Sequence, residues 1–254
     1  MLLAVDVGNT QTNFGVFKGD NLCCSWRIST NKEETADELA VTLVNLLSLR
    51  SLSLRDIDAV VISSVVPHCT ASLDEMVKNV LNLKATIVGP GIKTGIPLLY
   101  DNPREVGADR IVNAVAAYDI YGGPVIVVDF GTATTFDAIS SKGEYVGGAI
   151  APGIEISSEA LFEAAAKLSR VDLKIPRKII GKNTVESLQA GIMFGFAGQV
   201  DRIVNLMKQE MKDNPTVVST GGLANLITGE CETIDEVNSN LTLLGLKKIY
   251  IMNR

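Results

Sequence analysis

A pattern that occurs twice in this sequence constrains the fold more than any other feature. Near the N-terminus an apolar run ends in Asp-Val-Gly-Asn at residues 6–9, and a second apolar run ends in Asp-Phe-Gly-Thr at residues 129–132. Each turn precedes a stretch of β-forming residues, and the two aspartates lie 123 residues apart, about half of the 254-residue chain. On this alignment Thr12 corresponds to Thr135. The repetition predicts a duplicated chain, with a strand–turn–strand unit at the start of each half.

The rest of the chain alternates between strand-like and helix-like segments, which predicts an α/β fold. The sequence Gly-Gly-Pro at residues 122–124 is the natural break. We therefore predict an N-terminal domain at 1–121 and a C-terminal domain, with a terminal helix, at 122–254. The predicted strands are 2–7, 13–18, 22–29, 58–64, 85–88, 125–128, 133–139, 145–150 and 216–219, and the predicted helices are 35–50, 67–83, one that follows residues 107–110, 154–168, 185–212 and 239–254.

The charge balance excludes several classes of function. Acidic residues number 29 and basic residues 23, so the net charge is −6 at pH 7. Nucleic acid and anionic membrane surfaces attract cationic proteins, so we expect neither as a partner. No apolar run approaches the roughly 20 residues that span a membrane. Because Asp6 interrupts the N-terminal apolar run, that run is typical of a first strand and not of a signal peptide.

The single histidine and the four cysteines limit the chemistry further. His68 follows Pro67 before an amphipathic stretch, which favours a surface position at a helix start over a catalytic role. Acid–base chemistry would then fall to a carboxylate. None of the cysteines forms a Cys-x-x-Cys pair, which disfavours zinc and thioredoxin-type sites. Scattered, reduced thiols fit a protein of the cytoplasm.

The two glycine turns suit phosphate binding. A glycine after a strand lets backbone N–H groups approach a phosphate without a Cβ clash, and the neighbouring Asn9 and threonines add further donors. The aspartate before each glycine repels phosphate, but it can hold a cation that bridges to phosphate, or water bound to that cation. Together the turns favour a metal–nucleotide complex, and the alternative is two hairpins with ordinary turn chemistry. The sequence contains no P-loop, and its Rossmann-like match is incomplete.

A third cluster, Gly-Ala-Asp-Arg at residues 107–110, leads into a predicted helix. Asp109 could serve only as the helix cap or as a partner of the helix dipole. A kinase that phosphorylates an alcohol, however, needs a carboxylate that orients the hydroxyl and accepts its proton. Asp109 could supply that carboxylate, and Arg110 could bind an anionic group of the same acceptor.

Five motifs in one order carry a resemblance to a known family. They are the turn with Asp6, the Gly-Ala-Asp-Arg cluster, Asp-Phe-Gly-Thr-Ala-Thr-Thr at 129–135, a glycine-rich run at 147–153 and Thr-Gly-Gly at 220–222. Over nearly the whole chain, this combination resembles the type III pantothenate kinases of bacteria. The resemblance implies two duplicated ribonuclease-H-like halves of the acetate and sugar kinase/Hsp70/actin superfold, with nucleotide between them.

The resemblance also implies a reaction and its requirements. Such kinases use ATP to phosphorylate the terminal (4') hydroxyl of pantothenate, which gives 4'-phosphopantothenate in the first step towards coenzyme A. They require Mg²⁺ or a similar divalent cation with ATP, and a monovalent cation, K⁺ or NH₄⁺. They are homodimers, with pantothenate near the dimer interface.

Individual residues take roles by the same resemblance. Asp109 is the expected catalytic proton acceptor, Asp129 the expected monovalent-cation ligand, and Asp6 a possible ligand of magnesium-bound water. The expected ATP-binding residues are Asp6, Val7, Gly8, Asn9, Thr10, Gln11, Thr12, Asn13 and Thr132. The expected pantothenate-binding residues are Tyr100, Gly107, Ala108, Asp109, Arg110 and Thr184. One departure is the polar Gln-Thr-Asn at residues 11–13, where many relatives are more apolar.

Three alternatives stay open. Thr184 lies in Asn-Thr-Val-Glu, which also suits a helix start. Another kinase of the same superfold would act on a sugar, acetate or glycerol, although residues 107–110 argue against it. A non-catalytic nucleotide-binding regulatory protein is the alternative from a different class, and the intact Asp109 argues against that.

Overall fold

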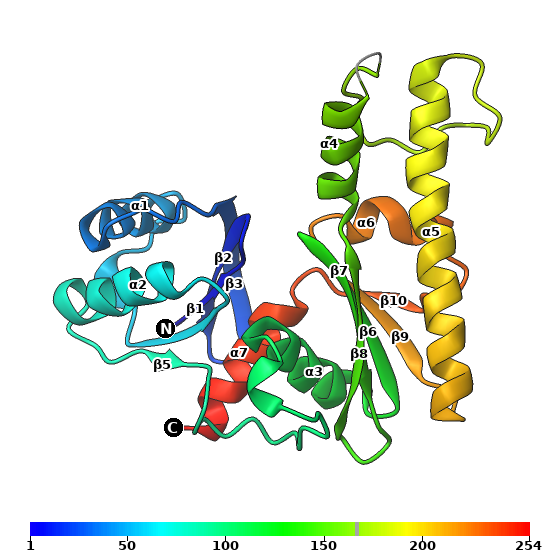
Figure 1. The fold of residues 1–254 in the computed structure, drawn as a ribbon. Coiled ribbons are helices and arrows are strands. Elements are labelled where there is room, and N and C mark those ends of the chain that lie inside the picture. The colour runs from blue at the N-terminus through cyan, green and yellow to red at the C-terminus, as the bar shows by residue number, and fades with distance from the viewer. Residues whose placement is uncertain (166–167) are drawn as a thin grey trace. The chain divides into compact units, whose positions relative to one another are not determined.

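The computed structural model describes residues 1–165 and 168–254 (Figure 1). The chain divides into two compact units, each built from more than one stretch of sequence. Unit 1 comprises Met1–Gly95, Asn102–Ala116 and Leu241–Arg254, and unit 2 comprises Ile96–Asp101 and Ala117–Asn240. The terminal helix, which a division at residue 122 assigns to the second half, therefore clusters with the first strands of the chain.

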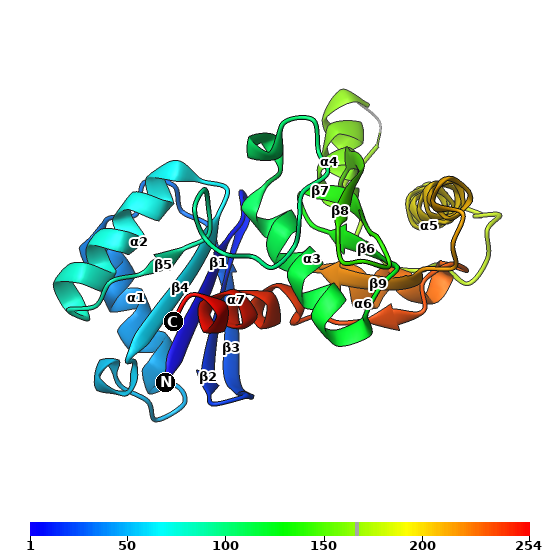
Figure 2. The same cartoon turned by 90° about the horizontal axis from the view of Figure 1, so that it is seen from below.

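Unit 1 is a five-stranded sheet with helices on both faces (Figure 2). Leu3 and Val5 of the first strand share one apolar cluster with the helices α1 (Ala36–Ser48) and α2 (Pro67–Val80). On the opposite face α7 (Leu241–Met252) packs on the same strand, and Leu243 lies against Gly15. The strands stand in the order β3-β2-β1-β4-β5, with bounds β1 Leu2–Val7, β2 Gln11–Lys18, β3 Asn21–Ser29, β4 Ala59–Ser64 and β5 Thr86–Ile87.

Unit 2 contains the second five-stranded sheet. Its core joins Val128 and Phe136 of the sheet to Met193 of the long helix α5 (Thr184–Met211). The strands stand in the order β10-β9-β6-β7-β8, with bounds β6 Val125–Phe130, β7 Ala133–Ile139, β8 Tyr145–Pro152, β9 Thr216–Gly221 and β10 Glu236–Val237. The remaining helices are α4 (Ile154–Ala164), α6 (Ala224–Ile227) and α3 (Ala108–Tyr121), whose residues are divided between the two units at Ala116.

The two sheets have the same topology, which confirms the predicted duplication. In each, the first strand pairs antiparallel with the second and parallel with the fourth. The register corrects one detail of the sequence alignment. Asp6 lies opposite Asn13 whereas Asp129 lies opposite Thr135, so Thr12 corresponds to Thr134 and not to Thr135. The reason is the second turn, in which residues 131–132 replace the longer 8–10.

Most predicted elements are present with shifted ends. Strand β7 has the predicted bounds, while β6 and β9 continue to Phe130 and Gly221. The predicted helix 154–168 ends at Ala164, and residues 166–167 lie outside the described residues. The elements that were not predicted are too short to show a periodicity. They are α6, β10 and the 3₁₀ helices Leu54–Asp56, Pro103–Glu105 and Thr228–Glu230.

Three simpler expectations can be compared with the structure. His68 is exposed in the first turn of α2, as predicted. All four cysteines are free thiols. Across residues 1–165 and 168–254, no helix has both the length and the apolar character needed to cross a membrane.

Candidate active site

The first glycine turn, in unit 1, is braced by hydrogen bonds. The N–H of Gly8 donates to the carbonyl of Gln11 at 2.9 Å and closes the turn between β1 and β2. Thr30, just after β3, donates its hydroxyl to the carbonyl of Gly8 at 2.8 Å and its N–H to the carbonyl of Thr10 at 2.9 Å. The hydroxyls of Thr30 and Thr12 lie 2.9 Å apart. These contacts fix the backbone of the turn.

Asp6 lies one residue before the end of β1, and its side chain is buried. Asn13 of β2 stands opposite and donates its amide to the Asp6 carboxylate at 3.4 Å. Arg27 of β3 stands opposite Asn13 and donates Nε–H to the amide oxygen of Asn13 at 2.9 Å. Because Arg27 occupies that oxygen, the NH₂ group of Asn13 is turned towards Asp6. The three side chains form a chain of contacts across three adjacent strands.

Burial and a neighbouring negative charge disfavour ionisation of Asp6. Burial raises the pKa of its carboxyl group, and the charge of Asp109 raises it further. The Asn13 amide and the Ser63 hydroxyl act in the opposite direction, and the pKa reaches about 7 from an ordinary 3.8. A nearby cation would offset the repulsion between the two carboxylates. The structure thus brings together two carboxylates that the sequence placed in separate motifs.

Gly107 immediately precedes α3, and residues 108–110 form its first turn. Asp109 is half-buried, and its carboxylate accepts the N–H of Arg110 at 2.8 Å. Burial raises the pKa of Asp109, while the N–H and the charge of Arg110 lower it. A Cβ atom at Gly107 would collide with Oδ1 of Asp109, so a glycine is needed to leave the carboxylate where it is. The Arg110 side chain is buried.

The second glycine turn, in unit 2, carries Asp129 and Thr132. Asp129 is half-buried, Thr132 is exposed, and the carbonyl of Thr132 accepts the N–H of Gly153 at 3.1 Å. Gly221 ends β9 with a φ of +97°, and a Cβ atom there would stand 2.5 Å from Oδ1 of Asp129. The Thr-Gly-Gly turn therefore places bare backbone against the Asp129 carboxylate.

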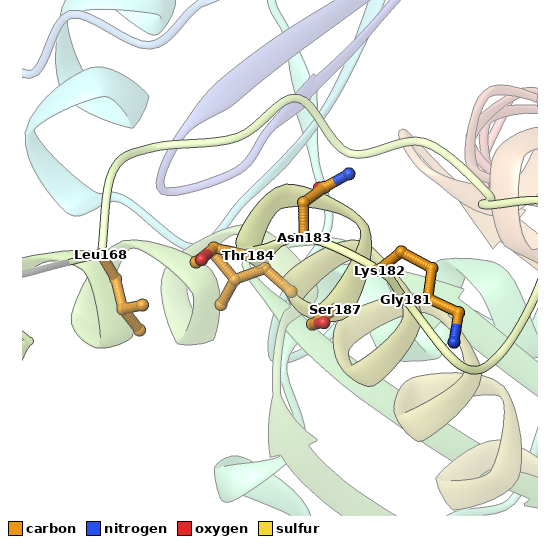
Figure 3. Close-up of a pocket in the computed structure, with 7 residues that line it drawn as sticks. Leu168, Gly181, Lys182, Asn183, Thr184 and Ser187 are labelled. Atoms are coloured by element: carbon orange, nitrogen blue, oxygen red, sulfur yellow. The ribbon is translucent and has the colours of Figure 1, made fainter.

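Tyr100 and Thr184 lie on separate elements of unit 2. Tyr100 is half-buried beside Tyr145 of β8, with the ring centroids 6.2 Å apart. Thr184 begins α5 and lines a pocket of about 460 Å³ (Figure 3). Within the described residues, the lining contains no second member of the predicted site. It consists of Leu168, Gly181, Lys182, Asn183, Thr184, Ser187 and Leu188.

Thr184 also begins a helix, which is the alternative interpretation of this segment that the sequence left open. The side chain of Asn183 accepts the N–H of Glu186 at 2.9 Å and caps α5. The carboxylate of Glu186 in turn accepts the N–H of Lys182 at 2.9 Å. These two hydrogen bonds fix the backbone on both sides of Thr184.

Three residues at the first turn were not predicted from the sequence: Arg27, Thr30 and Ser63. Ser63 is buried in β4, level with Asp6 in the parallel neighbour. A signal was present for each, because each lies near the end of a predicted strand beside the turn. Correct pairing of the first three strands would have placed Arg27 opposite Asn13.

Solved structures share this fold at low sequence identity. A protein from Campylobacter jejuni described as a Baf family transcriptional activator has a TM-score of 0.61 and 22% identity, over 99% of this chain and 98% of its own. The activator of 2-hydroxyisocaproyl-CoA dehydratase from Clostridium difficile, solved with ADPNP, has a TM-score of 0.58 and 14% identity, over 99% and 94%. A ROK hexokinase from Thermus thermophilus has a TM-score of 0.54 and 14% identity, over 100% and 99%. These likenesses establish the kinase/Hsp70/actin superfold.

Sequence comparison is more specific. The profile of the family described as type III pantothenate kinase matches residues 2–206. A curated type III pantothenate kinase from Moorella thermoacetica is 56% identical over 253 residues and covers all of both chains. The chain therefore belongs to the type III pantothenate kinase family.

Proposed function

We propose that this chain transfers the γ-phosphoryl group of ATP to the terminal hydroxyl of pantothenate, with Asp109 as proton acceptor. The product is 4'-phosphopantothenate, in the first step towards coenzyme A. Membership of the family makes the chain an ATP-dependent kinase. The observation that supports the role of Asp109 is that its charge raises the pKa of Asp6, the aspartate just before the first glycine turn.

The chemistry needs one carboxylate at the acceptor hydroxyl. The hydroxyl oxygen attacks the γ-phosphorus, the bond from that phosphorus to the bridging oxygen breaks, and ADP leaves. The hydroxyl proton passes to the carboxylate of Asp109. The N–H of Arg110 fixes this carboxylate, and burial raises its pKa, which makes it a better proton acceptor than an exposed aspartate.

The remaining predicted residues supply binding. We assign the phosphates of ATP to residues 6–13 and to Thr132, because fixed turn N–H groups and hydroxyls suit phosphate oxygens. We assign pantothenate to Tyr100, residues 107–110 and Thr184. The buried guanidinium of Arg110 suits the carboxylate of pantothenate, since Arg–carboxylate hydrogen bonds are strong and directional.

The carboxylates present fit a nucleotide-bound magnesium ion. Among residues 1–165 and 168–254, no group of three His, Cys, Asp or Glu side chains could cage a metal ion. Mg²⁺ in nucleotide sites needs only one or two carboxylates, because phosphates and water fill its other positions. Asp6 would hold the ion or its water. Its raised pKa fits this role, because a bound cation would offset the negative charge of Asp109 that contributes to the shift. When bound, the ion neutralises phosphate charge.

Asp129 would hold the monovalent cation, K⁺ or NH₄⁺. Its carboxylate lies beside the second turn and against the backbone of Gly221, where oxygen ligands are close at hand. We further propose that the protein is a cytoplasmic homodimer.

An activity assay tests the proposal. The protein is incubated with Mg-ATP and pantothenate in matched potassium and sodium buffers, and phosphopantothenate is measured by mass spectrometry. We expect product in potassium and little in sodium. Equal product in both buffers contradicts only the monovalent-cation assignment. Absence of product in both contradicts the function, and parallel reactions with glucose, acetate and glycerol would then identify another kinase of the superfold.

A further inference from the structure

The segment Ile96–Asp101, which carries Tyr100, is attached to the sheet of unit 2 through Tyr145. The N–H of Tyr145 donates to the carbonyl of Pro97 at 2.8 Å, and its carbonyl accepts the N–H of Leu99 at 2.9 Å. These bonds form a parallel bridge at the first residue of β8. The ring of Tyr145 also lies beside the ring of Tyr100, at an interplanar angle of 55°. One residue thus supports both the backbone and the aromatic side chain of the segment.

Tyr145 is itself held from the protein interior. Its side chain is fully buried, and its hydroxyl donates to Oδ1 of Asp137 at 2.7 Å. Asp137 lies in β7, is fully buried, and accepts a second hydrogen bond from the Thr135 hydroxyl at 3.3 Å. A buried carboxylate is costly unless it is hydrogen-bonded, so the Tyr145 hydroxyl is strongly constrained to this position.

We propose that Tyr145 and Asp137 are positioning residues that set Tyr100 for the acceptor substrate. The proposal rests on the proposed function, in which Tyr100 binds pantothenate. Both positioning side chains are fully buried, so they act through Tyr100 and not by contact with substrate. Their loss should weaken the binding of pantothenate and leave the binding of ATP unchanged.

Steady-state kinetics of Tyr145→Phe test the proposal. This change removes only the hydroxyl, and we expect the KM for pantothenate to rise roughly twofold to tenfold. The KM for ATP and kcat should stay within about twofold, since a positioning role removes no contact to ATP. Tyr121→Phe is the matched control: it removes a tyrosine hydroxyl of unit 2 that accepts the side-chain amide of Asn238 at 3.2 Å. It should change none of these constants.

A double-mutant cycle separates positioning from general disruption. Tyr100→Ala should itself raise the KM for pantothenate, and Tyr145→Phe should add no further increase in that background. The proposal is overturned if Tyr145→Phe multiplies the KM by the same factor in both backgrounds. It is also overturned if the KM values for pantothenate and ATP rise together. Asp137→Asn with Tyr145→Phe replaces the single variant if a buried, unpaired carboxylate prevents folding.

Amide hydrogen exchange provides a readout that needs no activity. In Tyr145→Phe the N–H of Leu99 should exchange faster than in wild type, whereas exchange in β1 and β2 should not change. Unchanged exchange at Leu99 would contradict the positioning role. If the wild type makes no phosphopantothenate while Tyr145→Phe still speeds exchange at Leu99, only the proposed function is contradicted.

Discussion

The charge of Asp109 raises the pKa of Asp6, although the two residues belong to motifs about a hundred positions apart in the sequence. Burial is the larger cause, and together they bring the pKa of Asp6 to about 7. In the ligand-free folded protein, burial and the charge of Asp109 therefore disfavour the ionised form of this carboxyl group. A site built to bind cations thus lowers the free energy of unfolding of the ligand-free protein.

Replacement of Asp6 by Asn should stabilise the ligand-free protein in a pH-dependent way. The unfolded pKa is 3.8 and the folded pKa about 7, so the unfolded chain releases its proton first as the pH rises. The free energy of unfolding of the wild type therefore falls between about pH 4 and pH 7. Asp6→Asn does not lose stability in this pH range. Its free energy of unfolding should exceed that of the wild type by about 1–4 kcal/mol at pH 8 and differ little from it at pH 4. Urea unfolding in EDTA at both pH values measures it.

Asp20→Asn is the control of opposite sign. The hydrogen bond and charge of Lys247 lower the pKa of Asp20 in the folded protein. The ionised carboxylate therefore stabilises the fold at pH values above the pKa that Asp20 has in the unfolded chain. Asp20→Asn should slightly destabilise the protein at pH 8, and this effect should disappear as the pH falls. A stabilisation by Asp6→Asn that is equal at pH 4 and pH 8 would contradict the stated cause.

Asp109→Asn should abolish most turnover while ATP binding survives. The amide keeps the size of the side chain but cannot accept the hydroxyl proton, and loss of such a group typically lowers kcat by about 10²–10⁴-fold. Calorimetric binding of a non-hydrolysable ATP analogue should change little. Asp119→Asn, an exposed aspartate in the same helix, is the matched control and should retain wild-type kcat. Near-normal turnover in folded Asp109→Asn would refute the role of Asp109.

The electrostatic interaction between Asp6 and Asp109 also marks where sequence reasoning reached its limit. Both aspartates were found from local patterns, because a glycine turn after a strand and an acidic residue at a helix start are short-range signals. Only the family resemblance placed both in one active site; the local patterns do not imply their proximity, because it depends on how α3 joins the sheet of unit 1. Local sequence does not specify such a long-range contact.

The terminal helix illustrates the same limit on the scale of the fold. The sequence predicts a helix over residues 239–254, and α7 is present. Its partner, however, is β1 at the other end of the chain, which a division of the sequence into two halves does not anticipate. The correspondence of Thr12 with Thr134 was missed for a local reason, since a single-residue difference in turn length shifts the alignment without altering composition.

Gly221→Ala should weaken both stability and the response to potassium. Alanine at φ +97° is strained, and its Cβ would stand 2.5 Å from Oδ1 of Asp129 and 2.6 Å from backbone atoms of Phe130. We expect a loss of about 1–3 kcal/mol in the free energy of unfolding. Because Asp129 must move, the K⁺ stimulation that we propose for this site should fall. Gly229→Ala, where a Cβ meets nothing within 4 Å, is the control, and equal effects of the two changes would contradict this account.

Thr30→Val should raise the KM for ATP without unfolding the protein. Valine keeps the shape of threonine but removes the hydroxyl that donates to the carbonyl of Gly8 and lies 2.9 Å from the hydroxyl of Thr12. The first turn then loses part of its brace, and we expect a rise of roughly twofold to tenfold in the KM for ATP. The KM for pantothenate should change less, since the hydrogen bonds of Thr30 run to Gly8, Thr10 and Thr12 of the turn and not to residues 107–110.

Thr42→Val is the matched control. It removes a comparable hydroxyl that donates to Glu34 at 3.0 Å in the same unit, and it should leave both constants unchanged. A KM for ATP that responds equally to the two substitutions would mean that the brace does not act on nucleotide binding.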